Sequence, residues 1–495
     1  MEFDYLGNKA LDLIENNDAS LFLTWKAGTG KTTLLKHFFE NTSKNYIVLW
    51  STWIAAINIG GSTIHSFFSF WKDINKSNVK KLYWKKLETL ENADIIVIDE
   101  ISMVRSDLLD CIDICMRSSL WNHELPFWGK QMLFVGDLYQ LPPVVSQAEQ
   151  KYILEEYKTE YFFSSFAFQE LDPYIIELQK VYRQDDVELV KVLNKFRVGL
   201  FSQSDIDFLN TKVINPWDIK DRDIVTLTTT NKDAWNTNIE RLSALPWESF
   251  VSHALIEWEF EQNLYPNLLE LEFKENAQIM MLNNNEFWKN WTIGKIKEII
   301  SEEEVIVEIN NNEYAVEPYE WNVLKPRYDK SIKKIVYDKV WKFIQFPFKL
   351  AWAITIHKSQ WLTFDKLLID FGKTVFAKWQ AYVALSRWTN LENMYFKRPV
   401  DKKDIKVDKR ITYFMSKALR PQKKDMIKYA YENNKNITFW YLKYNQEISQ
   451  RTIKLIDFWL DNYNWYDYFF VKGYCYLRDQ NRVFNIDKMY ELEVN

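Results

Sequence analysis

Residues 25–32 read Trp-Lys-Ala-Gly-Thr-Gly-Lys-Thr, which matches the G-x-x-x-x-G-K-[ST] phosphate-binding loop at every defined position except the first. A strand-like run precedes this segment and a helical run follows it, so backbone N–H groups and a helix N-terminus can surround phosphate oxygens. Lys31 would neutralise the β and γ phosphates, and the Thr32 hydroxyl would hold Mg²⁺. A glycine-rich turn that binds no ligand is the simpler alternative. The spacing favours a nucleotide site formed by Gly28, Thr29, Gly30, Lys31, Thr32 and Thr33.

A pair of acidic residues supports this interpretation. Asp99 and Glu100 follow the apolar run at residues 95–98. Asp99 would hold Mg²⁺ through water, and Glu100 would take a proton from the attacking water. An acidic pair at a strand end also caps following helices, but the two motifs together predict hydrolysis of a nucleoside triphosphate.

The elements that must position these residues are visible as apolar runs. Short runs typical of buried strands alternate with helical stretches at residues 21–24, 46–49, 95–98 and 132–135, the rhythm of a parallel sheet wrapped by helices. Runs at 224–228 and 366–369 predict a second α/β domain that is split in sequence, with short strands inserted between them.

We therefore expect an α/β fold of several domains. A polar stretch rich in Lys and Asn predicts a linker, and the aromatic-rich region beyond it predicts a small β-rich module. The expected domains are a first parallel-sheet domain at 1–150, a second at 151–244 and 339–415, an inserted β-domain at 245–338, the linker at 416–436 and the C-terminal module at 437–495.

Length and composition restrict the class of protein further. A chain of 495 residues is too long for one compact core. Because the net charge is -5, any contact with nucleic acid must come from a local basic and aromatic surface. Cys111, Cys115 and Cys475 are too few and too badly spaced for a disulfide framework or a zinc site. With no signal sequence and no apolar run of membrane length, we expect a cytoplasmic protein without a membrane partner.

Residues 135–144, Val-Gly-Asp-Leu-Tyr-Gln-Leu-Pro-Pro-Val, resemble motif III of the Pif and RecD-like group of superfamily 1 DNA helicases. Segments similar to the DNA-contacting motifs and to motifs IV, V and VI lie at 51–68, 181–184, 354–360 and 382–387, in the family's order. The resemblance implies two RecA-like P-loop NTPase domains, an SH3-like or OB-like inserted domain, and ATP-dependent DNA unwinding with Mg²⁺ as cofactor.

The resemblance also implies roles for individual residues. Gln140 would sense the γ-phosphate by hydrogen bonding, and Arg183 and Arg387 would reach across the cleft between the domains as arginine fingers. ATP binding and hydrolysis would then close and open the cleft. The implied partners are single-stranded DNA, followed from 5′ to 3′, and duplex junctions in repair, recombination or replication. We expect a monomer.

Hydroxyl, cationic and aromatic side chains of these motifs are expected to hold the DNA strand. For a phenylalanine, core packing is an equal alternative, and an isolated histidine is more often a satisfied core residue. The family reads adenine with a Gln near the N-terminus, but residues 3–10 contain none. The expected DNA contacts are Thr52, Thr63, His65, Phe67, His357, Lys358, Ser359 and Gln360.

The C-terminal module resembles a WYL domain, with matching segments at residues 469–478 and 482–487. The tripeptide that gives the family its name corresponds to Phe469-Phe470-Val471. The resemblance implies a face that binds a nucleic acid or a small ligand, whereas a small β-barrel with ordinary solvated charges is the alternative. The expected ligand face consists of Arg451, Tyr474, Arg478 and Arg482.

The tryptophan content is abnormal, since the chain has 22 Trp and only 11 Gly. Tryptophan stands where the helicase family has glycine at turns, although a turn favours a residue without Cβ. We hypothesise that the gene uses UGA for glycine and that the sequence reflects a table in which UGA is tryptophan. The seven positions are Trp25, Trp53, Trp128, Trp291, Trp341, Trp361 and Trp379.

Two other classes of function stay open at this level. Tryptophans that are truly encoded would favour a catalytically silent DNA-binding or scaffold protein. The C-terminal module alone would favour a ligand-sensing regulator, but that alternative leaves the motifs of the first 400 residues unexplained.

Overall fold

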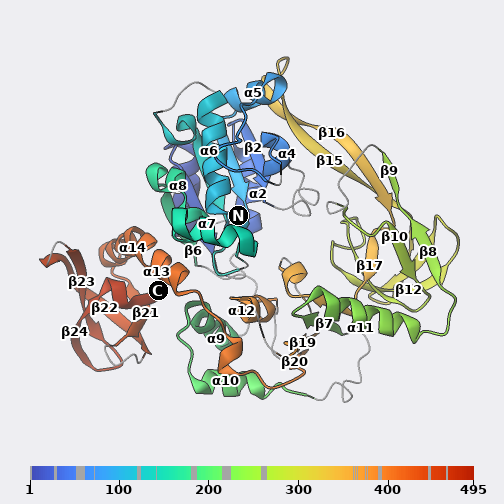
Figure 1. Cartoon of the computed structure of the whole chain (residues 1–495). Coiled ribbons are helices and arrows are strands. Elements are labelled where there is room, and N and C mark those ends of the chain that lie inside the picture. Colours follow the sequence, from blue (N-terminus) through green and yellow to red (C-terminus); the bar gives the residue numbers. More distant parts are fainter. Residues whose placement is uncertain are drawn as a thin grey trace.

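In the computed structural model of the chain, helices accompany two parallel sheets, and antiparallel sheets form the inserted region and the C-terminal unit (Figure 1). None of the helices in the described part of the chain is long and apolar enough to cross a membrane. The described residues are 3–26, 31–51, 62–71, 73–119, 124–140, 142–179, 187–214, 224–257, 265–360, 362, 364, 366–373, 375, 377–387, 393–443, 448–463 and 466–495.

The first domain contains a parallel sheet of six strands in the order β3-β2-β4-β5-β1-β6. Its central strands are buried along their whole length, as in a sheet covered by helices on both faces. All four strands predicted for this domain are confirmed. The strands are β1 (Leu21–Trp25), β2 (Tyr46–Trp50), β3 (Ser62–Thr63), β4 (Ile95–Asp99), β5 (Gln131–Val135) and β6 (Tyr174–Leu178). The helices are α1 (Tyr5–Glu15), α2 (Lys31–Asn41), α4 (Ile64–Phe68), α5 (Trp84–Glu91), α6 (Ser106–Ser119), α7 (Gln147–Tyr157) and α8 (Phe166–Leu171).

The first domain extends beyond residue 150, where the sequence suggested its end. β6 pairs in parallel with β1 along all five residues of both strands, so it completes the first sheet. At this sheet edge β6 is exposed at its start and buried only in its second half. Its apolar signal is therefore weaker than that of the central strands.

The second α/β domain contains a parallel sheet of four strands in the order β18-β7-β19-β20. One of these strands, β7, comes before the insertion in the chain and the other three come after it, which confirms the predicted split. The strands are β7 (Val225–Thr228), β18 (Ala353–Thr355), β19 (Leu367–Asp370) and β20 (Met394–Phe396), and the nearby helices are α9 (Val187–Val198), α10 (Gln203–Asn210), α11 (Asn231–Ser243) and α12 (Gln380–Leu385).

The inserted region is antiparallel and ends later than residue 338. Its main sheet has the order β14-β13-β12-β11-β17, so β17 (Phe348–Leu350) still belongs to it. The boundary was misplaced because β17 is a three-residue strand next to the second parallel sheet. The other strands are β8 (Phe250–His253), β10 (Glu270–Phe273), β11 (Gln278–Met281), β12 (Ile293–Ile299), β13 (Val305–Ile309) and β14 (Asn312–Val316).

A long hairpin of β15 (Tyr319–Asp329) and β16 (Lys334–Gln345), flanked by β9 (Leu255–Glu257), runs from the inserted region back to the first domain (Figure 1). Near the tip of the hairpin, Lys330 pairs with Glu88 of α5 at 2.8 Å. The Val48 N–H of β2 donates to the Tyr337 hydroxyl at 3.1 Å. The hairpin therefore joins the inserted region to the first domain over a long distance.

The C-terminal unit is an antiparallel sheet in the order β24-β23-β22-β21-β25. Instead of the predicted irregular linker at 416–436, helix α14 occupies most of that stretch and begins with Pro421 in its first turn, a favourable position for proline. Met426, Ile427 and Ala430 of α14 are buried in a cluster shared by this sheet and the first domain. The elements are α13 (Lys409–Ala418), α14 (Arg420–Glu432), β21 (Asn436–Leu442), β22 (Ile448–Tyr463), β23 (Tyr466–Cys475), β24 (Gln480–Asn485) and β25 (Met489–Val494).

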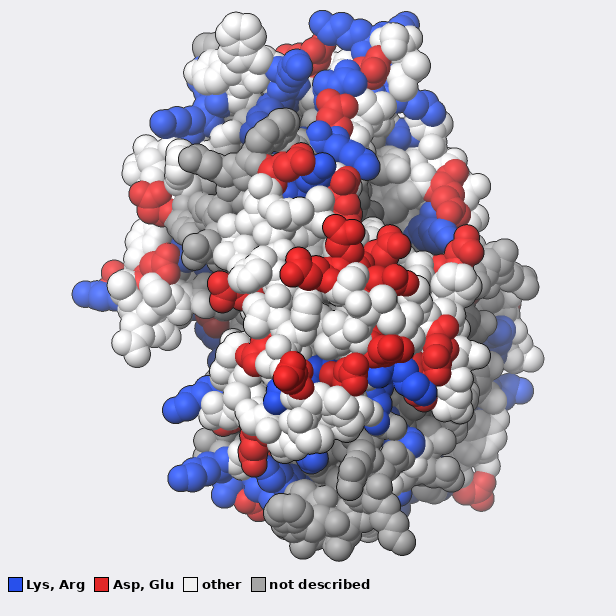
Figure 2. Space-filling view, turned by 90° about the vertical axis from the view of Figure 1, so that its right-hand side faces the viewer, with Lys and Arg blue, Asp and Glu red and all other residues white. Residues whose placement is uncertain are grey.

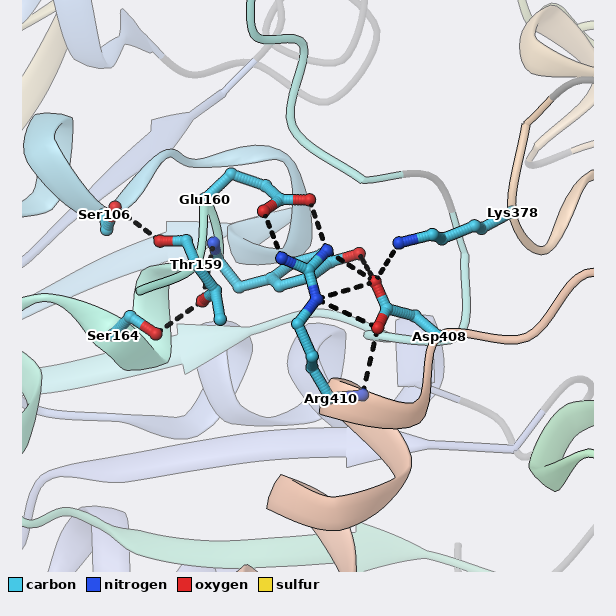
Figure 3. Close-up of polar contacts among 8 residues, drawn as sticks. Ser106, Thr159, Glu160, Ser164, Lys378, Asp408 and Arg410 are labelled. Carbon is cyan, nitrogen blue, oxygen red and sulfur yellow. Dashed lines mark hydrogen bonds and ion pairs between the residues drawn. The ribbon is translucent and has the colours of Figure 1, made fainter. Parts of the chain in front are cut away.

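A group of charged residues links the first domain to the segment that leads into α13 (Figure 3). Asp408 accepts hydrogen bonds from Lys378 at 2.7 Å and from the Tyr161 hydroxyl at 2.9 Å. Arg410 pairs with Asp408 at 2.7 Å and donates two bonds of 2.8 Å to Glu160. We call Glu160, Tyr161, Lys378, Asp408 and Arg410 the Asp408 cluster.

Candidate nucleotide site and DNA interface

Polar residues follow three neighbouring strands of the first sheet at one edge. Glu100 follows β4, Asp137 lies two residues beyond β5, and Lys26 follows β1. β5 lies between β4 and β1, and all three strands are parallel, so these residues lie at the same edge of the sheet. Open α/β sheets bind their ligands at the carboxyl ends of the strands. The sheet therefore brings the predicted nucleotide-binding segments to one place.

The predicted phosphate loop lies partly outside the described residues, which do not include Gly28, Thr29 and Gly30. Helix α2 begins at Lys31, directly after the loop. Because α2 follows β1, its N-terminus lies at the carboxyl edge of the sheet, where N–H groups favour an anion. Thr33 in its first turn is exposed.

Asp99 and Glu100 lie where the sequence predicts them, and both are almost fully buried. The Glu100 N–H donates to Asp99 Oδ1 at 2.7 Å, and Glu100 adopts a left-handed conformation with φ of 53°. Gly136 approaches this turn so closely that a Cβ there would lie 2.8 Å from Ile101 Cγ2. Mg²⁺ in phosphate-transfer sites is commonly held by one or two carboxylates together with substrate phosphates. Asp99 therefore fits the predicted metal role, beside the predicted base.

Asp137 and Gln140 of motif III form a buried polar turn beside this pair. The Asp137 carboxylate accepts the Tyr139 N–H at 3.0 Å and the Gln140 side-chain amide at 3.3 Å. Burial raises the pKa of Asp137 to about 6, although Arg197 opposes the shift. Gln140 is thus fixed at the carboxyl edge of the sheet.

Arg197 of α9 is a residue of this site that the motifs do not reveal. Its guanidinium donates to the Trp25 carbonyl at 3.1 Å, pairs with Glu177 at 2.7 Å and lies 4.1 Å from the centre of the Tyr139 ring. It is also 3.7 Å from Asp137. The only signal in the sequence is a basic residue within an amphipathic helix, which usually marks a solvated face.

The second domain contacts the first next to motif III. The Trp379 ring, at the start of α12, lies edge-on to Tyr139 with 5.2 Å between ring centres. Arg387, just beyond α12, donates to the Val383 carbonyl at 3.0 Å and to the Ser386 hydroxyl at 2.8 Å. It thus lies near the domain contact but is bonded within its own domain, where it also donates to the Ser359 carbonyl at 3.4 Å. The other predicted finger, Arg183, is outside the described residues.

Four of the predicted DNA contacts in the described part of the chain differ in how exposed their side chains are. The Thr63 hydroxyl is largely buried and accepts the Ser66 N–H at 3.1 Å, which caps α4. His65 on α4 is half-buried. After β18, Lys358 is exposed and His357 is half-buried, where burial lowers the pKa of His357. Thr52 is outside the described residues.

Three other predicted DNA contacts have buried side chains in this structure. Phe67 is 2% exposed and packs edge-on against Phe68, so the core-packing alternative holds. The Ser359 hydroxyl is inaccessible and donates to the Ile356 carbonyl at 2.8 Å. Gln360 is also buried. In this conformation these residues shape the core and the motif V turn rather than offer groups to DNA.

Three residues of the expected C-terminal ligand face, Arg451, Tyr474 and Arg482, lie on the adjacent strands β22, β23 and β24, and Arg478 lies in the turn between β23 and β24. Arg451 of β22 is buried, and its pKa is lowered first by burial and further by Arg478 and Arg482. Both of those arginines are exposed. The Tyr474 hydroxyl hydrogen-bonds to Asp479. Three arginines therefore lie near one another, one of them beneath the surface.

A parallel-sheet domain with an acidic pair and a motif III turn at its carboxyl edge, in contact with a second parallel-sheet domain that carries an arginine nearby, defines a two-domain nucleotide-driven motor. Residues 8–203 match the family described as PIF1-like helicase. The ATP-dependent DNA helicase Pif1 of Campylobacter jejuni is 33% identical over 406 residues, which cover 75% of this chain and 87% of that protein. The chain belongs to the Pif1-like helicase family, a family of ATP-dependent DNA helicases.

The chain covers less of several longer relatives, from 58% of yeast PIF1 to 64% of yeast RRM3. Among solved structures, Bacteroides Pif1 in complex with ADP-AlF4 is 32% identical and superposes with a TM-score of 0.77 over 85% of this chain and 98% of that one. Bacteroides Pif1 bound to ssDNA, at the same identity, gives 0.63 over 86% of this chain and 98% of that one. The chain therefore superposes less well on the structure with ssDNA.

Proposed function

We propose that this chain hydrolyses ATP to move 5′ to 3′ along single-stranded DNA and to unwind duplex junctions in repair, recombination or replication. The observation that carries the proposal is the buried pair Asp99 and Glu100 beside the motif III turn, where Arg197 of α9 in the second domain lies 3.7 Å from Asp137 and 4.1 Å from the centre of the Tyr139 ring. Membership of the Pif1-like helicase family supports the same activity.

The chain's residues divide the work of hydrolysis. Lys31 balances the charge of the terminal phosphates, and Thr32 with Asp99 would hold Mg²⁺, which supplies charge stabilisation when bound. Glu100 orients the attacking water and accepts its proton. Gln140 reports the presence of the γ-phosphate to the rest of motif III.

Arg387 gives this cycle a conformational step. To reach a phosphate it must exchange its bonds to Val383 and Ser386 for bonds to the nucleotide. Such an exchange makes closure of the cleft depend on bound nucleotide. Arg183, outside the described residues, is proposed as the second finger.

The DNA strand is proposed to contact Thr52, Thr63, His65, His357 and Lys358. The outer face of the inserted domain is a poor alternative, because acidic side chains gather on the side of the molecule that Figure 2 shows. Phosphates would be repelled there. Exposed glutamates of this region include Glu257, Glu270, Glu272, Glu298, Glu302, Glu303, Glu313, Glu317 and Glu320.

Strand displacement tests the proposed activity and its direction. With ATP, we expect a duplex with a 5′ single-stranded tail to be unwound and one with a 3′ tail to persist. Glu100→Gln is the matched control, since it keeps the shape of the side chain and removes the base. Unwinding from the 3′ tail alone would contradict the direction, and no ATP-dependent unwinding of either duplex would favour a silent DNA-binding protein.

We also propose that the functional protein has glycine at the seven tryptophan positions. Trp128, Trp291 and Trp379 have φ of 59°, 76° and 63°, the left-handed region that glycine adopts without strain. A residue with a Cβ loses about 1–2 kcal/mol in that conformation. Trp84 also has a positive φ, 57°, and its side chain is 89% exposed, but it is not one of the seven positions. Trp53 and Trp361 are outside the described residues.

The coding DNA decides this proposal. UGA at codons 25, 53, 361 and 379 is expected, and UGG at those codons would refute it. For the protein, we expect the Trp25 form to have negligible ATPase and the form with glycine at all seven positions to be active. Comparable turnover by both forms would show that the phosphate loop tolerates the indole.

For the C-terminal unit we propose a WYL-like face of Arg451, Tyr474, Arg478 and Arg482 that binds a nucleic acid or a small ligand. The neighbouring charges of the three arginines support an anionic ligand. We further propose that the protein works as a monomer in the cytoplasm.

A further inference from the structure

The last strand of the C-terminal unit contains a bulge that redirects one carboxylate. In the pairing of β25 with β21, Glu493 lies opposite Thr438 and Tyr490 opposite Trp440, so Glu491 falls at an irregularity of the register. Glu491 has a φ of 52°, a conformation rarely adopted by glutamate. Bulges commonly re-aim a side chain near functional sites.

Glu491 is directed out of its own sheet and into the first domain. It forms a buried ion pair with Lys26, the residue between β1 and the phosphate loop. Its other oxygen lies 3.8 Å from Arg197, which itself donates to the Trp25 carbonyl. The attraction of Lys26 and Arg197 lowers the pKa of Glu491 despite burial, so the carboxylate stays charged.

The surrounding elements hold this carboxylate in place. On α14, Gln422 exchanges two hydrogen bonds with the backbone of Glu177 in β6, at 2.8 Å and 3.1 Å. Lys423 donates to the Met489 carbonyl at the start of β25, at 2.7 Å. The C-terminal unit is thus fixed to the sheet at the strand next to β1.

We propose that Glu491 is a positioning residue for ATP hydrolysis, supplied by the C-terminal unit to the phosphate loop. It neutralises Lys26 and Arg197, whose contacts fix the backbone where β1 enters the loop. It does not touch the nucleotide. This role rests on the proposed ATPase activity. Through the contact of Glu491 with Lys26, the C-terminal unit would set the efficiency of ATP hydrolysis.

The physical basis is the cost of a misplaced phosphate loop. Without the carboxylate, Lys26 loses its buried ion-pair partner whereas Arg197 keeps Glu177, so the Lys26 ammonium and the backbone of Trp25 and Lys26 must shift to relieve an uncompensated buried charge. Displacements of about 1 Å in a catalytic site reduce rates by up to roughly a hundredfold. Such a shift weakens phosphate binding as well as turnover.

The test compares Glu491→Gln with Glu493→Gln in the full chain with glycine at the seven positions. Glu493 is a matched control on the same strand, because it is 3.7 Å from Lys26 but half exposed. We expect Glu491→Gln to lower kcat/KM for ATP about tenfold to a hundredfold, with a higher KM, and Glu493→Gln to stay within twofold of the parent. Glu491→Asp, which keeps the charge on a shorter side chain, should lie between them.

Thermal unfolding and binding of a fluorescent ATP analogue separate the outcomes. The assay temperature is set below the unfolding transition of every variant. Unchanged kcat and KM in Glu491→Gln would overturn the proposal, as would a loss that follows only the unfolded fraction. An inactive parent would refute the proposed ATPase, but weaker analogue binding by Glu491→Gln alone would still support the positioning role.

Discussion

Two charge clusters tie the domains of this chain together, and they differ in their exposure to solvent. In the Asp408 cluster, the Arg410 and Lys378 side chains are 33% and 42% exposed. In the Arg197 cluster, which comprises Lys26, Asp137, Glu177, Arg197 and Glu491, no side chain is more than 7% exposed. Both clusters join segments far apart in sequence, but only the first is in contact with water.

The difference indicates which junction can move. Ion pairs in contact with solvent contribute little to stability and re-form easily. Buried charges that lose a partner leave an uncompensated charge and destabilise the fold strongly. We therefore expect the Asp408 cluster to exchange partners as the cleft opens and closes, while the Arg197 cluster keeps the phosphate loop rigid.

The largest effect is expected at Arg197. Arg197→Met should lower the free energy of unfolding by about 3–5 kcal/mol, because three buried carboxylates lose their shared cation. Arg410→Met is the matched control from the other cluster and should cost about 1–2 kcal/mol, less because of solvent screening. Urea denaturation measures both, and equal losses would remove the distinction between the clusters.

A smaller loss is expected for Asp408→Asn, roughly 1–3 kcal/mol, because its neighbours lose a charged acceptor. Hydrogen bonds from Arg410, Lys378 and Tyr161 hold the pKa of Asp408 well below its usual value, against the opposing effect of burial. Its stabilisation is present above the unfolded pKa of about 4 and is lost as pH falls through the lower folded pKa. The stability difference between parent and variant should therefore shrink only in strong acid.

The two clusters should also respond differently to mild acid. The folded pKa of Asp137, about 6, exceeds its unfolded value of about 4, so protonation between these values favours the folded state. Protonation also removes the charge that faces Arg197 and the acceptor of Gln140. As the pH is lowered, we expect kcat for ATP hydrolysis to fall with a midpoint near pH 6. In Asp137→Asn this pH dependence should disappear. A decline only near pH 4 would show that Asp137 keeps an ordinary pKa.

The smallest effect is expected for Lys378→Met, below about 1 kcal/mol, since this lysine is well exposed and Asp408 keeps Arg410 as a partner. Chemical denaturation of parent and variant measures it. A loss as large as that of Arg197→Met would mean that the Asp408 cluster does not relax in solvent.

The strands and the acidic pair could be predicted from the sequence because their signals are local. The four apolar runs of the first domain and the position of Asp99 and Glu100 depend on neighbouring residues alone. β6 was missed because an edge strand has a weaker apolar pattern. Helix α14 was missed because its apolar residues are few among lysines.

The Arg197 cluster could not be predicted, for a different reason. Its members lie just beyond β1 and β5 and within β6, α9 and β25, and a charged residue at any of these places gives no sign of its distant partner. Glu491 reaches Lys26 only through a bulge, which no local pattern indicates. Phe67 and Ser359 show the converse: a motif predicts that a residue is needed but not whether it binds DNA or supports the turn.

The most direct test of the motor is ATP turnover with and without single-stranded DNA, measured on the full chain with glycine at the seven positions and on its Glu100→Gln variant. We expect DNA to raise turnover of the parent severalfold or more and Glu100→Gln to lose turnover in both conditions. Turnover that is unaffected by DNA, or that survives the loss of Glu100, would contradict a DNA-dependent motor centred on this site.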